Sequence, residues 1–388
     1  NSMMGDVPTV GYKSNMSKIR KTYKYRIYPS RTQVGILDEH LALCCELYNA
    51  ALQERRDAWR VVRKSVGFAA QSAQLVEIKE VRPELRHVYS QVLQDTLRLV
   101  DKTFKAFFGR VQRKVKAGFP RFRPRSRYDS LTYPQDGFSL QDSKLQLSKI
   151  GKVKINLHRP VEGKIKTLTI KREAGHWFAC FCVECKLEPL PACTEAIGID
   201  VGLATFATLS DGTKIDNPRY YRLAQSRLRK AQRKVSRRRC GSARRRKAIQ
   251  LLQRAHVHIR NQRSDFHHKT SERLVANFGL IVVEDLNIKG LASGMLAKSV
   301  GDAGWRMFLD KIAYKAANAG RLFFRVNPNG TSQTCLCGAS VPKTLDQRWH
   351  ECGECGLSAP RDHVSAQLVL RLGLSRQDRT WAVAPCVS

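Results

Sequence analysis

The sequence predicts a multidomain fold in which an α+β part is followed by an α/β part. The length of 388 residues is too great for one small domain and suffices for two to four. Near residue 118 a helical pattern of apolar residues gives way to strand-like segments, and from about Ala196 strands alternate with helices. This second change is typical of a three-layer α/β domain.

The charge of the chain predicts a polyanionic partner. Lys and Arg number 69 against 33 Asp and Glu, which gives a net charge of +36. Such an excess repels itself unless an anion neutralises it, and nucleic acid does so favourably because its condensed counterions are released. A membrane-surface protein is disfavoured, since we find no apolar run of about 18 residues and no signal-peptide pattern. We expect a cytoplasmic protein that binds nucleic acid and no membrane.

A strand and then a helical lobe are expected first. Residues 18–28 alternate as a strand does, and Pro29 ends the pattern. Ser30 and Gln33 have the spacing of a capping box, after which apolar residues recur at helical spacing. The helical lobe is predicted over residues 30–118.

Short alternating segments punctuated by glycines occupy residues 119–190 and predict a small antiparallel barrel or sandwich. Residues 18–29 are expected to supply its first strand, so that the helical lobe is an insertion. Residues 1–17 show no periodicity and are predicted to be disordered.

The α/β domain is predicted over residues 191–388. A long helical stretch is expected from about 222 to 277, and the apolar segment GLIVVEDL predicts a buried central strand. A last helix is expected near residues 363–372, ahead of a disordered tail over residues 375–388.

Three carboxylates in this domain form a candidate catalytic site. Asp200 and Glu284 each end a predicted central strand, and Asp362 opens the last helix. Ligands collect at strand ends in α/β sheets, and carboxylate oxygens suit Mg²⁺. Two such ions can stabilise the attacking and leaving oxygens of phosphodiester hydrolysis, with Asp200 bridging them. An Asp after a strand is also a common turn or cap residue, and Asp285 is an alternative ligand to Glu284.

A cluster of cysteines indicates a structural zinc site of the ribbon type. Four thiolates in two pairs suit tetrahedral Zn²⁺. The first pair is C-x-C, one residue shorter than usual, and His350 is a possible replacement ligand. The four predicted ligands are Cys335, Cys337, Cys352 and Cys355.

Two basic segments are candidates for contact with nucleic acid. Residues 219–247 carry fourteen Lys and Arg, residues 110–127 carry eight, and neither contains Asp or Glu. Aromatic residues in the latter segment allow stacking beside charge. The residues expected to contact nucleic acid are Arg121, Arg123, Arg237, Arg238, Arg244 and Arg245.

Several motifs together resemble the landmarks of TnpB, the transposon-encoded relatives of type V CRISPR effectors. The resemblance runs from about Lys18 to Leu372. Its motifs are KTYKYRIYPS, GFPRFRPRSRYDSLTYP, GIDVGLATFATLSDG, IVVEDLNIKGL, LAKSVGDAGW, NPNGTSQTCLCG, WHECGECG and RDHVSAQ.

The resemblance implies the identity of each domain. A split OB-like β-barrel, the wedge, would comprise residues 18–29 and 119–190, with residues 30–118 as the inserted helical recognition lobe. A RuvC-like (RNase H-like) nuclease domain would follow over residues 191–388, with a zinc ribbon inserted at residues 327–358.

The resemblance also implies an activity and its partners. A monomeric protein would bind an ωRNA guide and cut double-stranded DNA beside a short transposon-adjacent motif, at the nucleoid of a prokaryotic cell. Asp200, Glu284 and Asp362 match the family's Mg²⁺-binding catalytic positions, and the four cysteines match its zinc positions. Tyr48, Asn49 and Thr132 lie in regions that match those reading the motif.

The sequence departs from the family pattern around Asp362, where Pro360 precedes the Arg-Asp pair and His363-Val364-Ser365 follows it. Two alternatives remain open. One is an RNA-guided DNA-binding repressor that no longer cuts, for which the loss of an acidic residue is expected. The other is a DNA transposase, which does not by itself explain a zinc ribbon between the second and third carboxylates.

Overall fold

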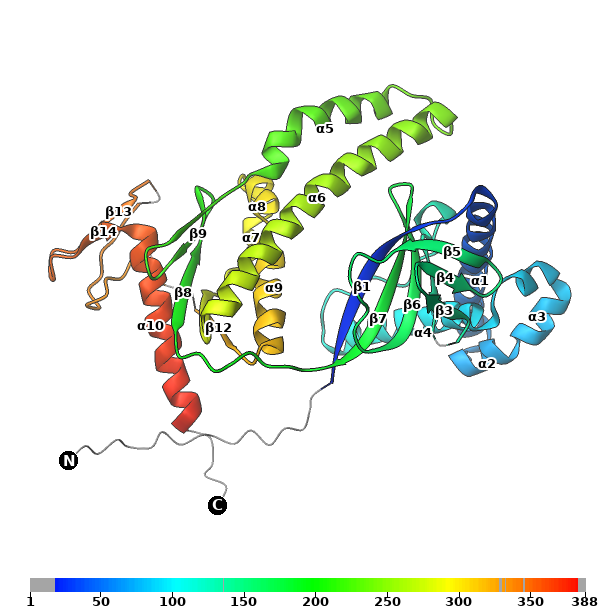
Figure 1. The fold of residues 1–388 in the computed structure, drawn as a ribbon, viewed down its shortest axis with the longest axis horizontal. Helices are drawn as coiled ribbons and strands as arrows, with labels where there is room; N and C mark the ends of the chain where they lie inside the picture. Colours follow the sequence, from blue (N-terminus) through cyan, green and yellow to red (C-terminus); the bar gives the residue numbers. More distant parts are fainter. Residues whose placement is uncertain (1–17, 135, 328–329, 332, 345, 383–388) are drawn as a thin grey trace, which may run out of the picture. The chain divides into compact units, whose positions relative to one another are not determined.

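The computed structural model describes residues 18–134, 136–327, 330–331, 333–344 and 346–382. Two compact units divide the chain, residues 1–186 and residues 187–388 (Figure 1). No helix among the described residues is both long enough and apolar enough to cross a bilayer.

Unit 1 contains a curled antiparallel sheet with the order β2-β6-β7-β1-β5-β4-β3 (Figure 1). The first strand lies inside the sheet, because it pairs with β7 on one side and β5 on the other. The strands are β1 (Lys18–Tyr28), β2 (Ser130–Tyr133), β3 (Phe138–Gln141), β4 (Lys144–Leu147), β5 (Gly151–Asn156), β6 (Lys164–Glu173) and β7 (His176–Lys186).

The helices of unit 1 are inserted between β1 and β2. The capping box is present, since the Ser30 hydroxyl accepts from the Gln33 backbone N–H at 3.2 Å and the Gln33 side chain accepts from the Ser30 N–H at 3.0 Å. The segment comprises α1 (Arg31–Val62), α2 (Phe68–Ala73), α3 (Leu75–Val81), η1 (Pro83–His87) and α4 (Ser90–Gln112), with η2 (Arg125–Arg127) before β2.

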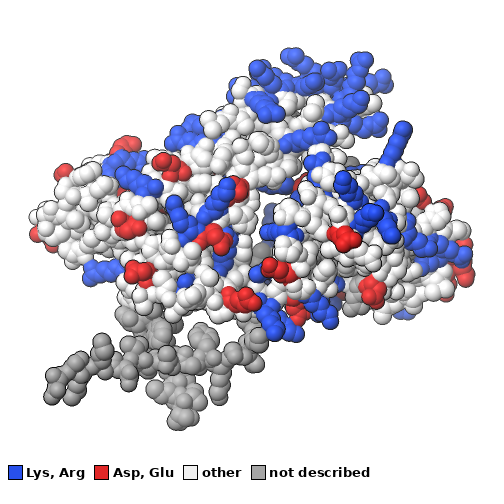
Figure 2. Space-filling model, in the orientation of Figure 1, with Lys and Arg blue, Asp and Glu red and all other residues white. Residues whose placement is uncertain are grey.

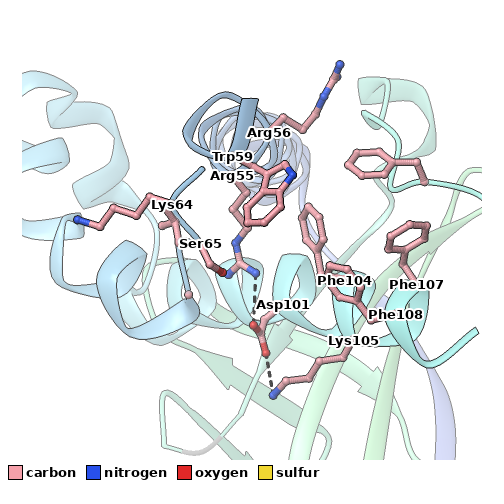
Figure 3. Close-up of a pocket in the computed structure, with 13 residues that line it drawn as sticks. Arg55, Arg56, Trp59, Lys64, Ser65, Asp101, Phe104, Lys105, Phe107 and Phe108 are labelled. Atoms are coloured by element: carbon pink, nitrogen blue, oxygen red, sulfur yellow. Dashed lines mark hydrogen bonds and ion pairs between the residues drawn. The ribbon is translucent and has the colours of Figure 1, made fainter. Parts of the chain in front are cut away.

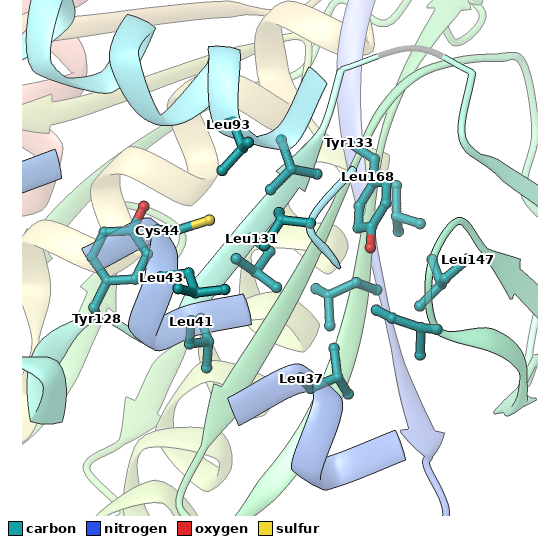
Figure 4. Close-up of a cluster of buried hydrophobic side chains, with 14 of the residues drawn as sticks. Leu37, Leu41, Leu43, Cys44, Leu93, Tyr128, Leu131, Tyr133, Leu147 and Leu168 are labelled. Atoms are coloured by element: carbon teal, nitrogen blue, oxygen red, sulfur yellow. The ribbon is translucent and has the colours of Figure 1, made fainter. Parts of the chain in front are cut away.

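One hydrophobic core joins the helices of unit 1 to its sheet. Leu37 and Leu41 of α1 and Leu93 of α4 meet strand residues such as Leu131 and Leu168 (Figure 4). The insertion is therefore packed on the sheet rather than tethered to it.

Unit 2 contains a mixed sheet with the order β10-β9-β8-β11-β12. Strand β11 runs parallel to both β8 and β12, whereas β9 is antiparallel to β8 and to β10. The carboxyl ends of β8 and β11 consequently lie side by side. The strands are β8 (Ala196–Val201), β9 (Thr205–Leu209), β10 (Lys214–Asp216), β11 (Leu280–Glu284) and β12 (Leu322–Val326).

Helices cover both faces of this sheet. Ile281 and Val283 pack into a core with α6, α8 and α9, while Leu280 and Val282 face Val369 of the last helix. The helices are α5 (Tyr220–Ser236), α6 (Ala243–Asn277), α7 (Ile288–Leu291), α8 (Ala297–Ala303), α9 (Trp305–Asn318) and α10 (Arg361–Ala382). The result is the three-layer arrangement expected from the alternation of strands and helices.

Two predicted boundaries differ from the structure. The stretch predicted as one helix over 222–277 is two, because Gly241 adopts φ +78° and Ser242 begins α6 by accepting from the Arg245 N–H. The predicted disordered tail is helical up to Ala382, since residues 375–382 contain neither Gly nor Pro. The predictions for residues 1–17 and 383–388 lie outside the described residues.

Candidate active site and cysteine cluster

The three predicted carboxylates line one cavity of about 290 Å³. Asp200 is the penultimate residue of β8, Glu284 is the last of β11, and Asp362 is the second of α10. The first two meet because their strands are parallel neighbours, with Ile199 opposite Val283. The third is brought to them by α10, which packs across β8.

Burial and mutual repulsion shape the acidity of this site. Burial raises the pKa of Asp200 well above its usual value, and the charges of Glu284 and Asp362 raise it further, while Arg361 works against them. Burial also raises the pKa of Glu284. The raised pKa of Asp200 therefore reports both its burial and the two carboxylates beside it.

A threonine that the sequence analysis missed holds Glu284. The Thr331 hydroxyl donates to Glu284 Oε1 at 2.5 Å, and this bond lowers the pKa of Glu284 against the effect of burial. Thr331 is itself buried and lines the same cavity. No sequence pattern gives this pairing, because the two residues are 47 positions apart.

Two arginines also line the acidic cavity. Arg361 Nε lies 3.7 Å from Asp362 Oδ1, and its backbone N–H donates to the Arg348 carbonyl oxygen at 2.9 Å. Arg348 contributes to the wall of the cavity as well. Two guanidinium groups therefore lie beside the carboxylates, where they can form ion pairs with a phosphate or with the carboxylates.

The position of Asp362 depends on a close approach between α10 and the sheet. A Cβ atom on Gly198 of β8 would lie 2.2 Å from the Ala366 carbonyl oxygen and 2.7 Å from the Leu370 nitrogen. On the helix side, a Cβ on Gly373 would lie 2.3 Å from Val282. Because neither glycine has a side chain, the backbone of α10 can lie directly on β8 and β11.

The four predicted cysteines converge. Their sulfur atoms all lie within 4.8 Å of one another, with Cys335 and Cys355 at 3.5 Å and Cys337 and Cys352 at 3.7 Å. Thiolates at Zn–S distances of about 2.3 Å in a tetrahedron stand about 3.8 Å apart. The cluster thus has the spacing and donor set of a site that can bind zinc, despite the shortened first pair.

The alternative ligand His350 does not join this cluster. Its side chain is fully buried, and Nδ1 contacts the Lys343 ammonium instead.

Among the residues that the structure describes, the cysteines form the only group of three or more donor atoms within 4.8 Å, so the carboxylates surround their cavity rather than share one point. The hairpin of β13 (Trp349–Glu351) and β14 (Ser358–Pro360) links the cluster directly to Arg361 and Asp362.

The predicted nucleic-acid contacts in unit 2 lie at one end of a helix pair. Helices α5 and α6 pack together, and Figure 2 shows Lys and Arg gathered over their far end. The arginines predicted there occupy the turn between the helices and the first turn of α6, and they are exposed or half-buried; they are Arg237, Arg238, Arg244 and Arg245.

The candidates in unit 1 divide into surface and interior residues. Arg121 is exposed, and Thr132 is half-buried and bonded to Thr169 at 3.2 Å. Tyr48 is 1% exposed, with the Arg123 guanidinium 4.6 Å from its ring centroid, and the Asn49 amide exchanges two 2.9 Å bonds with the Arg123 backbone. Tyr48 and Asn49 therefore hold the Arg123 segment. Tyr48 is buried and Asn49 is half-buried, and a role for them in reading DNA stays a prediction.

Models of three protein families match successive parts of the chain. "Probable transposase" matches residues 180–294, "Cas12f1-like, TNB domain" matches residues 305–369, and "Helix-turn-helix domain" matches residues 16–64. The last region contains β1 and α1, a strand followed by one long helix.

Two curated proteins resemble almost the whole chain. "Putative RNA-guided DNA endonuclease" of Streptomyces pristinaespiralis is 35% identical over 371 residues, which cover 93% of this chain and 91% of that protein. "Putative RNA-guided DNA endonuclease InsQ" of Escherichia coli (strain K12) is 29% identical over 376 residues, which cover 91% of this chain and 92% of that protein.

Two solved structures share the fold at low identity. One is a Cas12f1–sgRNA–target DNA complex, with a TM-score of 0.56 at 12% identity over 91% of this chain and 98% of that one. The other is the mini-RNA-guided endonuclease CRISPR-Cas_phi3, with a TM-score of 0.56 at 10% identity over 92% and 93%. The 35% identity over nearly the full length of a curated relative shows that the chain belongs to the TnpB family of RNA-guided DNA endonucleases.

Proposed function

We propose that this protein is an RNA-guided DNA endonuclease whose catalytic residues are Asp200, Glu284 and Asp362. The observation that carries the proposal is the shared cavity, in which burial and two neighbouring charges raise the pKa of Asp200. Such a concentration of half-buried carboxylates, in a chain with a net charge of +36, is typical of a functional site. Unit 2 would be a RuvC-like (RNase H-like) nuclease domain, and the sheet of unit 1 an OB-like wedge.

The residues around the cavity suit Mg²⁺. Three half-buried carboxylates line the cavity, and hard oxygen donors are what this ion prefers. Asp200 would contribute to two ions, while Glu284 and Asp362 would each contribute to one. When bound, two such ions polarise the scissile phosphate and lower the pKa of water.

The neighbouring residues would position these carboxylates and the substrate. The Thr331 hydroxyl fixes Oε1 of Glu284. Arg348 and Arg361 would contact phosphate oxygens at the rim of the cavity. Zinc held by the four cysteines would support the hairpin that leads to Asp362, so its effect on cutting would be indirect.

The other partners would be a guide RNA (ωRNA) and double-stranded DNA. Phosphate contacts are assigned to the basic end of the α5–α6 pair and to the basic segment of residues 110–127. In the domain scheme implied by the family, residues 30–118 form the recognition lobe, residues 18–29 and 119–190 the wedge, and residues 191–388 the nuclease with its ribbon at 327–358. A single protein chain would act in the ribonucleoprotein.

The test uses the protein purified with its bound RNA. Sequencing that RNA defines the target for a plasmid library with randomised flanking sequence, which is incubated with Mg²⁺ and either the parent or Asp200→Ala. We expect linear product from the parent alone, and Asp216→Ala, an exposed carboxylate of the same unit, should cut like the parent.

Each alternative has its own signature in the same experiment. Equal product from parent and Asp200→Ala removes the acidic residues from the mechanism. Target binding by the parent without cutting indicates a repressor, and strand joining to a second DNA in the absence of RNA indicates a transposase.

A further inference from the structure

A second cavity, of about 530 Å³, lies in the helical part of unit 1 (Figure 3). It is formed between the second half of α1, the loop that follows it, α4 and the segment around Phe119. Its volume is within the range of small-ligand sites. The proposed nuclease chemistry makes no use of it.

Aromatic side chains make up much of the wall, and several are exposed. Trp59 is 56% exposed, Phe108 is 55% and Phe119 is 49%. Phe107 packs edge-on against both Phe108 and Phe119, with centroids 5.2 and 5.3 Å apart. The Arg63 guanidinium lies 5.9 Å from the Trp59 ring centroid, but about half of each of these three side chains stays exposed, so flat apolar surface remains open to a ligand.

A buried guanidinium belongs to the same wall. Arg55 is 8% exposed, its Nε donates to Gln71 at 2.9 Å, and its Nη1 donates to Asp101 at 3.3 Å. Its Nη2 is buried and has no hydrogen-bond partner among the described residues. A buried donor without a partner costs free energy; this one is closed to solvent, so an acceptor in the cavity reaches it only when the guanidinium turns.

The rim of the cavity is basic. Arg56, Lys64 and Lys105 line it. The single carboxylate, Asp101, is already neutralised by Arg55 and by Lys105, whose ammonium lies 3.0 Å away. The occupant should therefore combine a flat apolar face, a hydrogen-bond acceptor at its edge and an anionic chain.

We propose that this cavity binds one unpaired nucleobase of the guide RNA. The base would stack on Trp59 or the phenylalanines, and the adjoining phosphates would lie against the basic rim. A ring nitrogen or carbonyl oxygen would accept from Arg55 Nη2 once the guanidinium turns toward the cavity. RNA is favoured over DNA because loops and bulges of the guide present unstacked bases whenever the guide is bound, whereas DNA presents them only in the displaced strand after the target duplex opens. This inference rests on the proposed function for the presence of a guide.

The first test locates contacts directly and needs no cleavage. The ribonucleoprotein is irradiated with ultraviolet light, digested with nuclease and protease, and searched by mass spectrometry for nucleotide adducts. We expect a ribonucleotide on the peptide that carries Trp59 or on the one that carries Phe104 to Phe119. Adducts on α5 and α6 without any on these two peptides overturn the inference. A deoxyribonucleotide on either peptide, recognised by a mass lower by one oxygen, overturns it as well.

The second test measures RNA affinity in Trp59→Ala, with Tyr28→Ala as the matched control. Both side chains are exposed aromatic groups of unit 1, and thermal unfolding verifies that each variant folds. Loss of stacking should weaken binding of the copurified RNA by roughly 5- to 100-fold without changing the salt dependence, because no phosphate contact is removed. Tyr28→Ala should bind like the parent.

The two tests separate this inference from the proposed function. Parent-like affinity in Trp59→Ala overturns the inference, as does a change of oligomeric state with RNA affinity unchanged, which would assign the cavity to protein contact. A ribonucleotide adduct here in a protein that cuts no DNA supports the inference while the nuclease proposal fails.

Discussion

The hydroxyl of Thr331 donates a 2.5 Å hydrogen bond to Glu284. Thr331→Val keeps the shape of the side chain but leaves a buried carboxylate oxygen without this donor. Such a loss costs about 1–3 kcal/mol, and if it falls on the transition state, cleavage slows by roughly 5- to 100-fold. Initial rates of plasmid cutting over a series of Mg²⁺ concentrations measure the effect. The control is Thr334→Val in the same loop, whose hydroxyl donates to the Gly330 carbonyl oxygen, and equal slowing in both variants would refute the specific role of Thr331.

Asp200→Asn should stabilise the metal-free protein at neutral pH. Burial and two neighbouring charges raise the pKa of Asp200 in the folded state, so the folded protein binds this proton more tightly than the unfolded chain does. The resulting stability is present below the ordinary carboxyl pKa of 3.8 and is lost as the pH rises through the raised value. The neutral amide avoids that loss, and the midpoint of thermal unfolding should rise by about 2–4 °C for each kcal/mol gained.

The pH dependence distinguishes this cause from a general effect of the substitution. The advantage of Asp200→Asn should vanish as the pH approaches 3.8 and grow towards neutrality, and Mg²⁺ should stabilise the parent more than the variant. Asp216→Asn, at an exposed position of the same unit, should change nothing. A constant gain at every pH would contradict the electrostatic explanation.

Cys355→Ser should release zinc and slow cutting although the carboxylates are intact. The cluster adjoins the hairpin that leads to Asp362, and a displacement of about 1 Å at a reacting group can cost about 100-fold in rate. Metal analysis should find about one zinc per chain in the parent and much less in the variant. Cys193→Ser, at a half-buried cysteine of unit 2 outside the cluster, should retain both metal and activity. Full activity in a zinc-free variant would show that the ribbon does not position Asp362.

Gly198→Ala should destabilise unit 2 and displace Asp362. The new Cβ would lie 2.2 Å from the Ala366 carbonyl oxygen, so α10 must shift, and overpacking of this kind costs about 1–3 kcal/mol. Denaturant unfolding and cleavage rates should both report the loss. The control is Gly301→Ala in α8, where no atom lies within 4 Å of the new Cβ and helix propensity favours alanine. Parent-like stability in Gly198→Ala would mean that α10 does not need this close approach.

The family, the capping box at Ser30 and the alternation of strands and helices could be predicted from the sequence, because each depends on the order of residues close together in the chain. The placement of Asp200 and Glu284 beside one cavity also follows a general rule, since neighbouring parallel strands end at one edge of a sheet. The break between α5 and α6 had a local signal in Gly241 followed by Ser242, which the periodicity of the flanking residues obscured.

Other features depend on contacts between distant segments. The pairing of Thr331 with Glu284 arises from a loop that returns to the sheet edge, and the burial of Tyr48 arises from packing against the segment around Arg123. The unpartnered Nη2 of Arg55 depends on where Gln71 and Asp101 come to lie. Composition and periodicity do not predict contacts between residues that are far apart in the sequence.

The pairing of β1 with β7 has a consequence for biosynthesis. Lys18 of β1 lies opposite Lys186 of β7. Strand β1 is the first of unit 1 to leave the ribosome and β7 is the last, so β1 cannot pair with β7 until the whole unit has been synthesised. At about 5–20 residues per second the interval is roughly 8–30 seconds. Throughout that time the nascent chain exposes an unpaired strand edge, while α1 can already wind behind its capping box. The sheet of unit 1 is therefore completed by its last strand. A stalled or truncated product ending before residue 176 would lack β7, the strand that joins β1 to β6.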